Sequence, residues 1–187
     1  MMRWIPFGAA TLLLALAPAC QREPREAKTV ESVPGAAGRI SDEDKEFMTE
    51  AAQGSMLEIA LGKHVAAETT DPDVKALGNR TAEDHARAHE ELKQIAARKG
   101  LKLPTQLEED RREEFSEMTR LSGTKLDAEY ADEMVEDHEM HVKDFREAAR
   151  EVKDPELRAW AARTLPILEK HLEEARRIKA KVAPEED

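Results

Sequence analysis

Two stretches decide the fold: DPDVKALGNRT at residues 71–81 and DPELRAWAART at residues 154–164. They align without a gap at an offset of 83 residues, and the same offset carried outward pairs Asp44 with Asp127 and Phe47 with Tyr130. An ungapped match that runs through a helix, a turn and a second helix indicates an internal duplication. We therefore expect two copies of one helical hairpin.

Capping residues mark where the helices of each hairpin begin and end. Asp71 and Asp154 each precede a proline, a pair typical of the N-cap and the first helical position. Ser41, with an acid three residues later, predicts the first helix start, and Gly100 predicts the end of the second helix. The sequence thus predicts four long helices, at about residues 41–69, 72–99, 127–152 and 155–182.

The link between the hairpins is long, from about residue 100 to 126, and contains a helical run at about 105–121. An up-down-up-down bundle needs only short links, so this length predicts a crossover along the bundle, as in ferritin-like folds. The two hairpin turns then lie at opposite ends of the bundle. We expect an all-α, ferritin-like four-helix bundle over residues 41–183 and a short tail at 184–187.

Composition excludes several classes of fold and function. Charged residues make up 37% of the 187 residues and aromatic residues only 4%, which excludes an all-β fold and favours helices. The formal net charge of −11 argues against nucleic acid as a partner. The chain has a single cysteine, no glycine-rich phosphate loop and no constellation around a catalytic nucleophile. These features support no enzyme class other than a metal-dependent oxidoreductase, and a protein without enzymatic activity is the favoured interpretation.

The N-terminus has the pattern of an export signal. Arg3 is followed by an apolar stretch at residues 4–16 and by Ala17-Pro18-Ala19-Cys20, with the only cysteine last. This resembles a bacterial lipobox, although Ala17 stands where Leu is usual. We expect a signal peptide at 1–19, then a lipidated Cys20 and a flexible tether over 20–40. The residue after it, Gln21, favours a lipoprotein of the outer membrane, on its periplasmic face. Cleavage without lipidation, which would leave a soluble periplasmic protein, is the alternative.

Polar residues interrupt the apolar stripe of every predicted long helix at mid-height. At 100° per residue, one carboxylate and four imidazoles fall on these stripes: Glu58, His85, His138, His141 and His171. His64 and His89 fit the stripes less well and are expected at the surface. The tripeptide Glu-Asp-His occurs twice, so Asp84 and Asp137 are candidates to orient a histidine.

Two interpretations of this mid-bundle level stay open. The first is a metal site, because imidazole and carboxylate suit Zn, Fe, Cu or Mn and bundle cores hold such sites. The second is a hydrogen-bonded polar layer without metal, in which Glu58 pairs with one protonated histidine. Thr81, Tyr130 or water would then satisfy the other imidazoles.

The domain resembles a bacterial family of unknown function, the ferritin-like domain of unknown function 4142, often labelled predicted outer membrane protein. The matching stretches are 47–52, MLEIALGK at 56–63, DPDVKALGNRTAEDH at 71–85, Leu121-Ser122-Gly123, Tyr130, EDH at 136–138 and LPILEKHL at 165–172. The resemblance implies a ferritin-like bundle and export, but no reaction. Its pattern highlights Glu58, Asp84, His85, Asp137, His138 and His171.

The chain departs from di-iron ferritins, which use a Glu-x-x-His pair on two helices. Ala82 and Leu168 stand three residues before His85 and His171, so a mononuclear site fits better than a di-iron oxidase. The expected function is that of an exported, non-enzymatic helical module with a role in stress protection or protein contact. The alternatives are a transition-metal-binding protein and, less favoured, a metal-dependent oxidoreductase.

Overall fold

The computed structural model describes residues 40–182. The predicted signal peptide, Cys20, nearly all of the predicted tether and the tail at 184–187 lie outside the described residues. Within them the chain forms five helices and no strand: α1 (Asp42–Glu68), α2 (Pro72–Arg98), α3 (Glu109–Met118), α4 (Gly123–Glu151) and α5 (Pro155–Val182). None of these helices combines the length and the apolar character that crossing a membrane requires.

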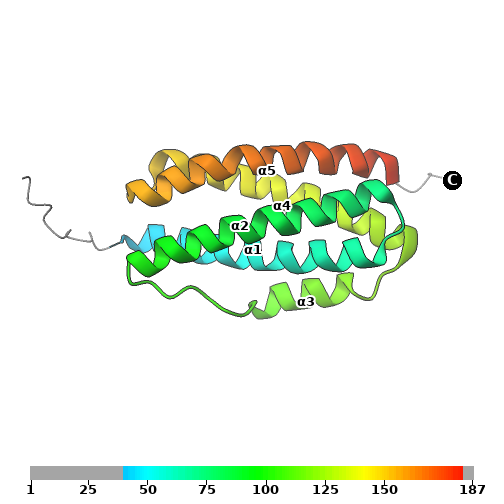
Figure 1. Cartoon of the computed structure of the whole chain (residues 1–187), viewed down its shortest axis with the longest axis horizontal. Coiled ribbons are helices and arrows are strands. Elements are labelled where there is room, and N and C mark those ends of the chain that lie inside the picture. Colours follow the sequence, from blue (N-terminus) through cyan, green and yellow to red (C-terminus); the bar gives the residue numbers. More distant parts are fainter. Residues whose placement is uncertain (1–39, 183–187) are drawn as a thin grey trace, which may run out of the picture. The chain divides into compact units, whose positions relative to one another are not determined.

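The four long helices form a bundle of two antiparallel hairpins (Figure 1). The most extensive packing lies within the hairpins, between α1 and α2 and between α4 and α5, and the hairpins meet where α2 packs on α5 and α1 on α4. The two hairpin turns lie at opposite ends of the bundle, and the crossover with α3 runs back along α1 (Figure 1). The predicted all-α bundle with a helical crossover is confirmed.

The predicted caps are present. The side chain of Ser41 accepts a hydrogen bond from the backbone N–H of Asp44 at 3.1 Å. Asp71 and Asp154 each accept two backbone N–H groups of the helix that follows. Gly100 has a φ of +69°, the left-handed conformation that ends a helix and that a side chain would strain.

Two predicted boundaries are wrong. The crossover helix covers 109–118 rather than 105–121, because the buried Gln53 of α1 holds the preceding residues in a non-helical path. Its amide donates to the carbonyl of Gln106 at 3.1 Å, and its oxygen accepts the N–H of Glu108 at 3.2 Å. Helix α4 begins at Gly123 rather than at 127, since the additional turn places Leu126 in the core, where it is fully buried.

Each hairpin binds the turn of the other through equivalent residues of the duplication. Buried Asp44 accepts the backbone N–H groups of Lys153 and Asp154 at 3.1 and 2.9 Å. Its counterpart 83 residues later, buried Asp127, accepts the hydroxyl of Thr69 at the opposite end. These contacts at the two ends hold the hairpins in a fixed position relative to each other along the bundle axis. The middles of the four helices therefore lie at one level.

Candidate metal centre

Three histidines from three helices meet in the middle of the core. His85 of α2, His138 of α4 and His171 of α5 are 6%, 0% and 1% exposed. One ring nitrogen from each lies within 4.8 Å of the other two. The ring centroids are 5.7 Å apart for His85 and His138, 5.7 Å for His85 and His171, and 5.2 Å for His138 and His171. Mid-helix periodicity brought these residues to one height, and the packing of α2 on α5 and α5 on α4 brought them together.

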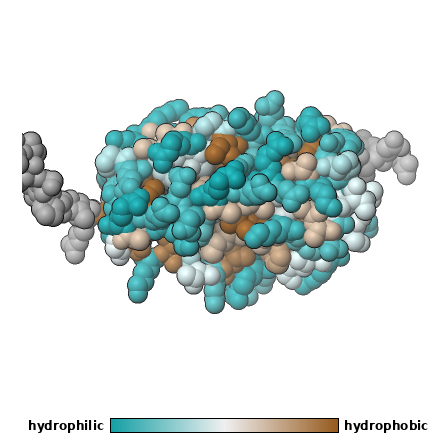
Figure 2. Space-filling view, in the orientation of Figure 1, coloured by the Kyte–Doolittle hydropathy of each residue, from teal (hydrophilic) through white to brown (hydrophobic). Residues whose placement is uncertain are grey.

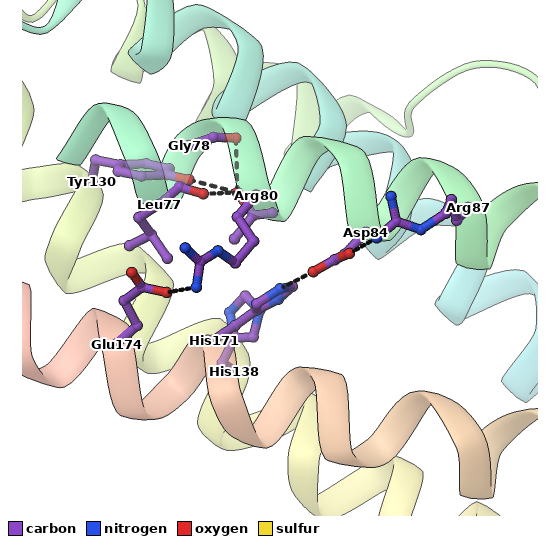
Figure 3. A network of polar contacts seen from close by, with 10 residues as sticks. Leu77, Gly78, Arg80, Asp84, Arg87, Tyr130, His138, His171 and Glu174 are labelled. Carbon is purple, nitrogen blue, oxygen red and sulfur yellow. Dashed lines mark hydrogen bonds and ion pairs between the residues drawn. The ribbon is translucent and has the colours of Figure 1, made fainter. Parts of the chain in front are cut away.

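The hydrogen bonds of His138 and His171 define which nitrogens carry protons. Nδ1 of His138 lies 3.0 Å from the carbonyl oxygen of Met134, and Nε2 of His171 lies 2.9 Å from a carboxylate oxygen of Asp84 (Figure 3). Carbonyl and carboxylate oxygens accept, so both of these nitrogens donate. In the neutral rings, Nε2 of His138 and Nδ1 of His171 then carry lone pairs, and these two atoms face each other at 3.2 Å.

Electrostatics keep these rings neutral. Burial, followed by the neighbouring imidazoles, holds the pKa of His85 and of His138 well below the ordinary value of 6.5. Burial also lowers the pKa of His171, although the hydrogen bond to Asp84 opposes it. All three imidazoles are therefore unprotonated at pH 7, which is the form that binds a metal ion.

Glu58 lies beside the histidines without a hydrogen bond. Its side chain is fully buried, with Oε1 3.5 Å from Nδ1 of His138. Neither carboxylate oxygen has a hydrogen-bond partner, and Nε2 of His85 also has none. Burial raises the pKa of Glu58 well above 4.5, and the charges of Asp137, Glu133 and Glu114 raise it further.

His141 lies next to the three histidines but outside the group whose nitrogens converge. Its ring centroid is 5.9 Å from that of His138 and 6.4 Å from that of His85. Its Nδ1 is buried without a partner, and its Nε2 lies so close to α1 that a Cβ on Gly54 would be 2.9 Å away. His64 and His89, expected at the surface, are half-buried.

The two Glu-Asp-His tripeptides differ in what their aspartates do. Asp84 accepts from His171 and also pairs with Arg87 (Figure 3). Asp137 instead lies with Glu114 of α3 and Glu133 of α4, and one oxygen of each is within 4.8 Å of the other two. The sequence pattern does not mark Glu114 and Glu133, because an acid that faces a neighbouring helix has the same pattern as one that faces solvent.

The partners expected for a metal-free polar layer are engaged elsewhere. The hydroxyls of Thr81 and Tyr130 are 2.9 Å apart and bind each other. Thr81 is further tied to the carbonyls of Leu77 and Gly78 in its own helix. Among the described hydrogen bonds, neither hydroxyl reaches a histidine.

The comparisons with known proteins give one result. The model of a family described as "Domain of unknown function (DUF4142)" matches residues 29–178, which is most of the chain. No curated protein and no solved structure matches the chain.

Proposed function

The chain belongs to the DUF4142 family, and from its buried histidines we propose that it is a non-enzymatic protein of the cell envelope that binds a transition-metal ion. One observation carries the proposal: two nitrogens with lone pairs, Nε2 of His138 and Nδ1 of His171, face each other at 3.2 Å in the core. Two acceptors at this distance repel each other unless a proton or a cation lies between them.

A metal ion fits the spacing. Two metal–nitrogen bonds of about 2.05 Å at a tetrahedral angle place their nitrogens about 3.3 Å apart. His85 supplies the third imidazole, because its Nε2 is buried without another partner. Asp84 holds His171 in the tautomer that leaves Nδ1 free, as carboxylates beside metal-bound histidines do.

The competing polar layer needs a proton between His138 and His171, and hence a buried imidazolium. Burial disfavours that charge on either ring, and the neighbouring imidazoles disfavour it further on His138. Asp84 would balance the charge on His171, but Glu58, the acid that this layer should pair with a histidine, makes no hydrogen bond. Buried polar groups in native cores are nearly always paired. A bound cation would account for the unpaired carboxylate of Glu58 and for the unpaired Nε2 of His85.

The ligand set and the space around it favour binding over turnover. Three neutral imidazoles suit Zn, Fe or Cu, with Mn the least favoured, and the lack of a Glu-x-x-His pair favours one ion. Two cavities touch these histidines, one lined by His85 and His141 and one by His85 and His171, and each holds about 10 Å³. That is the space of about one water molecule, which fits a protein that stores or buffers a metal.

The proposed location rests on the sequence. Cys20 at the end of an apolar signal would carry the acyl chains, and the segment up to residue 40 would join the anchor to the bundle. The periplasmic face of the outer membrane is the proposed site.

The test is elemental analysis of the native chain, purified without a histidine tag. We expect one equivalent of transition metal, lost in the double variant His85→Ala/His171→Ala. The matched control is His89→Ala, which removes a half-buried histidine from α2 one turn beyond His85 and should keep the metal. A chelator should lower the melting temperature of the wild type but not of the double variant.

Asp84→Ala tests the assigned tautomer. Without the carboxylate, Nδ1 and Nε2 of His171 compete for the proton, and metal affinity should fall about 10–100-fold. The control Arg87→Ala removes the ion pair of Asp84 but not its hydrogen bond to His171. The proposal would be contradicted by a native protein that contains no metal and whose melting temperature does not change with chelator. The hydrogen-bonded polar layer would then be the remaining interpretation.

A further inference from the structure

A small cavity lies in the core beside the converging histidines, and all four long helices contribute to its lining. Its polar and small lining residues are Ser55 of α1, His85 and Ala88 of α2, His141 of α4, and Trp160 and Thr164 of α5. Its volume of about 10 Å³ is just enough for one water molecule. The cavity touches the metal site through His85.

The duplication explains why this cavity exists. The residues 83 positions away from the three converging histidines are Ser55, Ala88 and Leu168, and all three line the cavity. The side chains of Ser55 and Ala88 are smaller than an imidazole ring, so they leave space where the other copy of the repeat has histidines. The cavity is therefore the counterpart of the histidine site.

Two of the lining residues have a buried nitrogen that the proposed metal ion does not use. Trp160 is fully buried, and its Nε1 has no hydrogen-bond partner among the described residues. The same is true of Nδ1 of His141. An indole N–H can only donate, so Trp160 requires an acceptor, and buried groups of this kind are nearly always paired.

His85 differs from the other two converging histidines because no protein group orients its ring. His138 donates to the carbonyl of Met134, and His171 donates to Asp84. Within residues 40–182, no hydrogen bond includes His85, and its Nε2 is buried without a partner. A histidine that binds a metal through one nitrogen almost always donates the other N–H to an oxygen, which can be that of a water molecule.

The cavity offers the two to four polar partners that a water-sized molecule needs. Trp160 supplies a donor, and each of the imidazoles of His85 and His141 supplies a donor or an acceptor, according to its tautomer. The hydroxyls of Ser55 and Thr164 lie in the same lining. No carboxylate, lysine or arginine lines the cavity in the described part of the chain, so an ion there would lack a counter-ion from its walls.

We infer that this cavity binds one small uncharged molecule that presents an oxygen, of the size of water, and that this molecule orients His85 as Asp84 orients His171. Trp160 and His141 are then positioning residues, which act on His85 through the bound molecule. The orienting role rests on the proposed metal site. Binding in the cavity does not, because Trp160 and His141 require a partner with or without a metal.

The experiment is ¹⁵N NMR of the chelator-treated full chain, with water as the probe. The chain has only two tryptophans, Trp4 and Trp160, so Trp160→Phe identifies the indole signal of the buried one. We expect a rotating-frame Overhauser effect between this N–H and water, with the sign of a dipolar contact rather than of proton exchange. Ala88→Val fills the cavity and should remove the effect. The matched control Ala86→Val enlarges an exposed alanine of the same helix and should keep it.

A second measurement follows His85 and its metal. The ¹⁵N shifts of its two ring nitrogens report which one carries the proton. Without metal, we expect one tautomer in the wild type and a mixture in Ala88→Val, while His171, which Asp84 holds, stays unchanged. The affinity for Zn²⁺ should fall about 10–100-fold in Ala88→Val and stay the same in Ala86→Val.

The outcomes separate this inference from the proposed function. A wild-type Trp160 signal without contact to water, or a contact that persists in Ala88→Val, would overturn the binding site. Equal Zn²⁺ affinities of the two alanine variants would overturn the orienting role and leave the metal site intact. A wild type that binds no Zn²⁺ but loses its water contact in Ala88→Val would contradict the proposed function and the orienting role, and would support the binding site.

Discussion

The chemistry of a buried histidine depends on which groups its two ring nitrogens bind, and the histidines of this core differ in these partners. His138 and His171 each give their one proton to a fixed acceptor and turn the other nitrogen toward each other. His141 lies one turn from His138 with a buried Nδ1 that has no partner. Nothing in the described part of the chain forms a hydrogen bond with this nitrogen. We therefore expect His141 to affect the free energy of unfolding through the pH at which its ring is protonated.

His141 should make the metal-free protein sensitive to acid. Burial lowers its pKa from 6.5 to about 4. Between pH 6.5 and pH 4 the unfolded chain therefore binds a proton that the folded chain does not, and the free energy of unfolding falls as the pH falls through this window. From pH 7 to pH 4 the loss due to His141 should be about 2–3 kcal/mol. Denaturant unfolding of the wild type and of His141→Asn, each with chelator, measures it.

The difference between the wild type and His141→Asn isolates the contribution of His141 to the pH dependence of stability. The raised pKa values of Glu58 and Glu114 act in the opposite direction, since stability from their protonated forms is lost as the pH rises above 4.5, but both proteins contain them. In the half-buried control His89→Asn the difference from wild type should depend much less on pH. A difference between wild type and His141→Asn that stays constant from pH 7 to pH 4 would show that His141 is protonated equally in both states.

At the level of whole helices, the sequence predicts where a helix begins and ends better than it predicts which residues of other helices contact it. Asp71, Asp154 and Gly100 act locally, through hydrogen bonds or a backbone conformation within a few residues, and their helix ends were predicted to within about one residue. The start of the crossover helix was not, because Gln53 acts on Gln106 from another helix. Such a contact leaves no local signal.

The residues of the candidate site show the same difference between signals within one helix and contacts between helices. Periodicity identified the core-facing histidines, since a stripe position depends only on the helix that carries it. It placed Asp137 beside a histidine by analogy with Asp84, whereas α3 brings Glu114 to it. It also did not distinguish His141 from the converging three, because the packing of neighbouring helices decides which ring nitrogens converge.

Helices α1 and α2 approach each other closely at Gly62 and Gly78. A Cβ on Gly62 would lie 2.4 Å from the backbone oxygen of Gly78 and 2.9 Å from Oγ1 of Thr81. The first contact is with backbone, which cannot turn away as a side chain can. Gly62→Ala should therefore destabilise the protein by about 3 kcal/mol, although alanine at an exposed helix position gains up to about 1 kcal/mol over glycine. Chemical denaturation gives the value.

Gly54→Ala is the matched comparison on the same helix. Its added Cβ would meet only the ring of His141, at 2.9 Å from Nε2, and this ring can shift. Its cost should be smaller than that of Gly62→Ala and should shrink further in combination with His141→Asn. Equal costs at the two glycines would mean that helix separation, rather than a local obstacle, sets the penalty.

For the whole molecule, the duplication supplies a symmetric scaffold on which the site is asymmetric. Asp44 and Asp127 keep the same role in both halves. At the offset of 83 residues, however, His138 corresponds to Ser55 and His171 to Ala88, and Glu58 corresponds to His141. The histidine cluster therefore occurs once, and it combines one residue of the first hairpin with two of the second. The face of the bundle in Figure 2 is mostly hydrophilic, with only small scattered apolar areas.

The last prediction concerns where this hydrophilic bundle is held. Cys20 is the only cysteine and closes an apolar signal that begins after Arg3. If its thiol carries acyl chains, each buried methylene adds about 0.8 kcal/mol of membrane affinity, so the wild type should fractionate with membranes. Cys20→Ser keeps the signal but removes the acceptor, and it should appear in the soluble periplasmic fraction without incorporating labelled fatty acid. Gln21→Asp is the control: it should stay lipidated and move from the outer to the inner membrane. A Cys20→Ser protein that remains on membranes, beside a wild type without lipid, would show that another part of the chain makes the attachment.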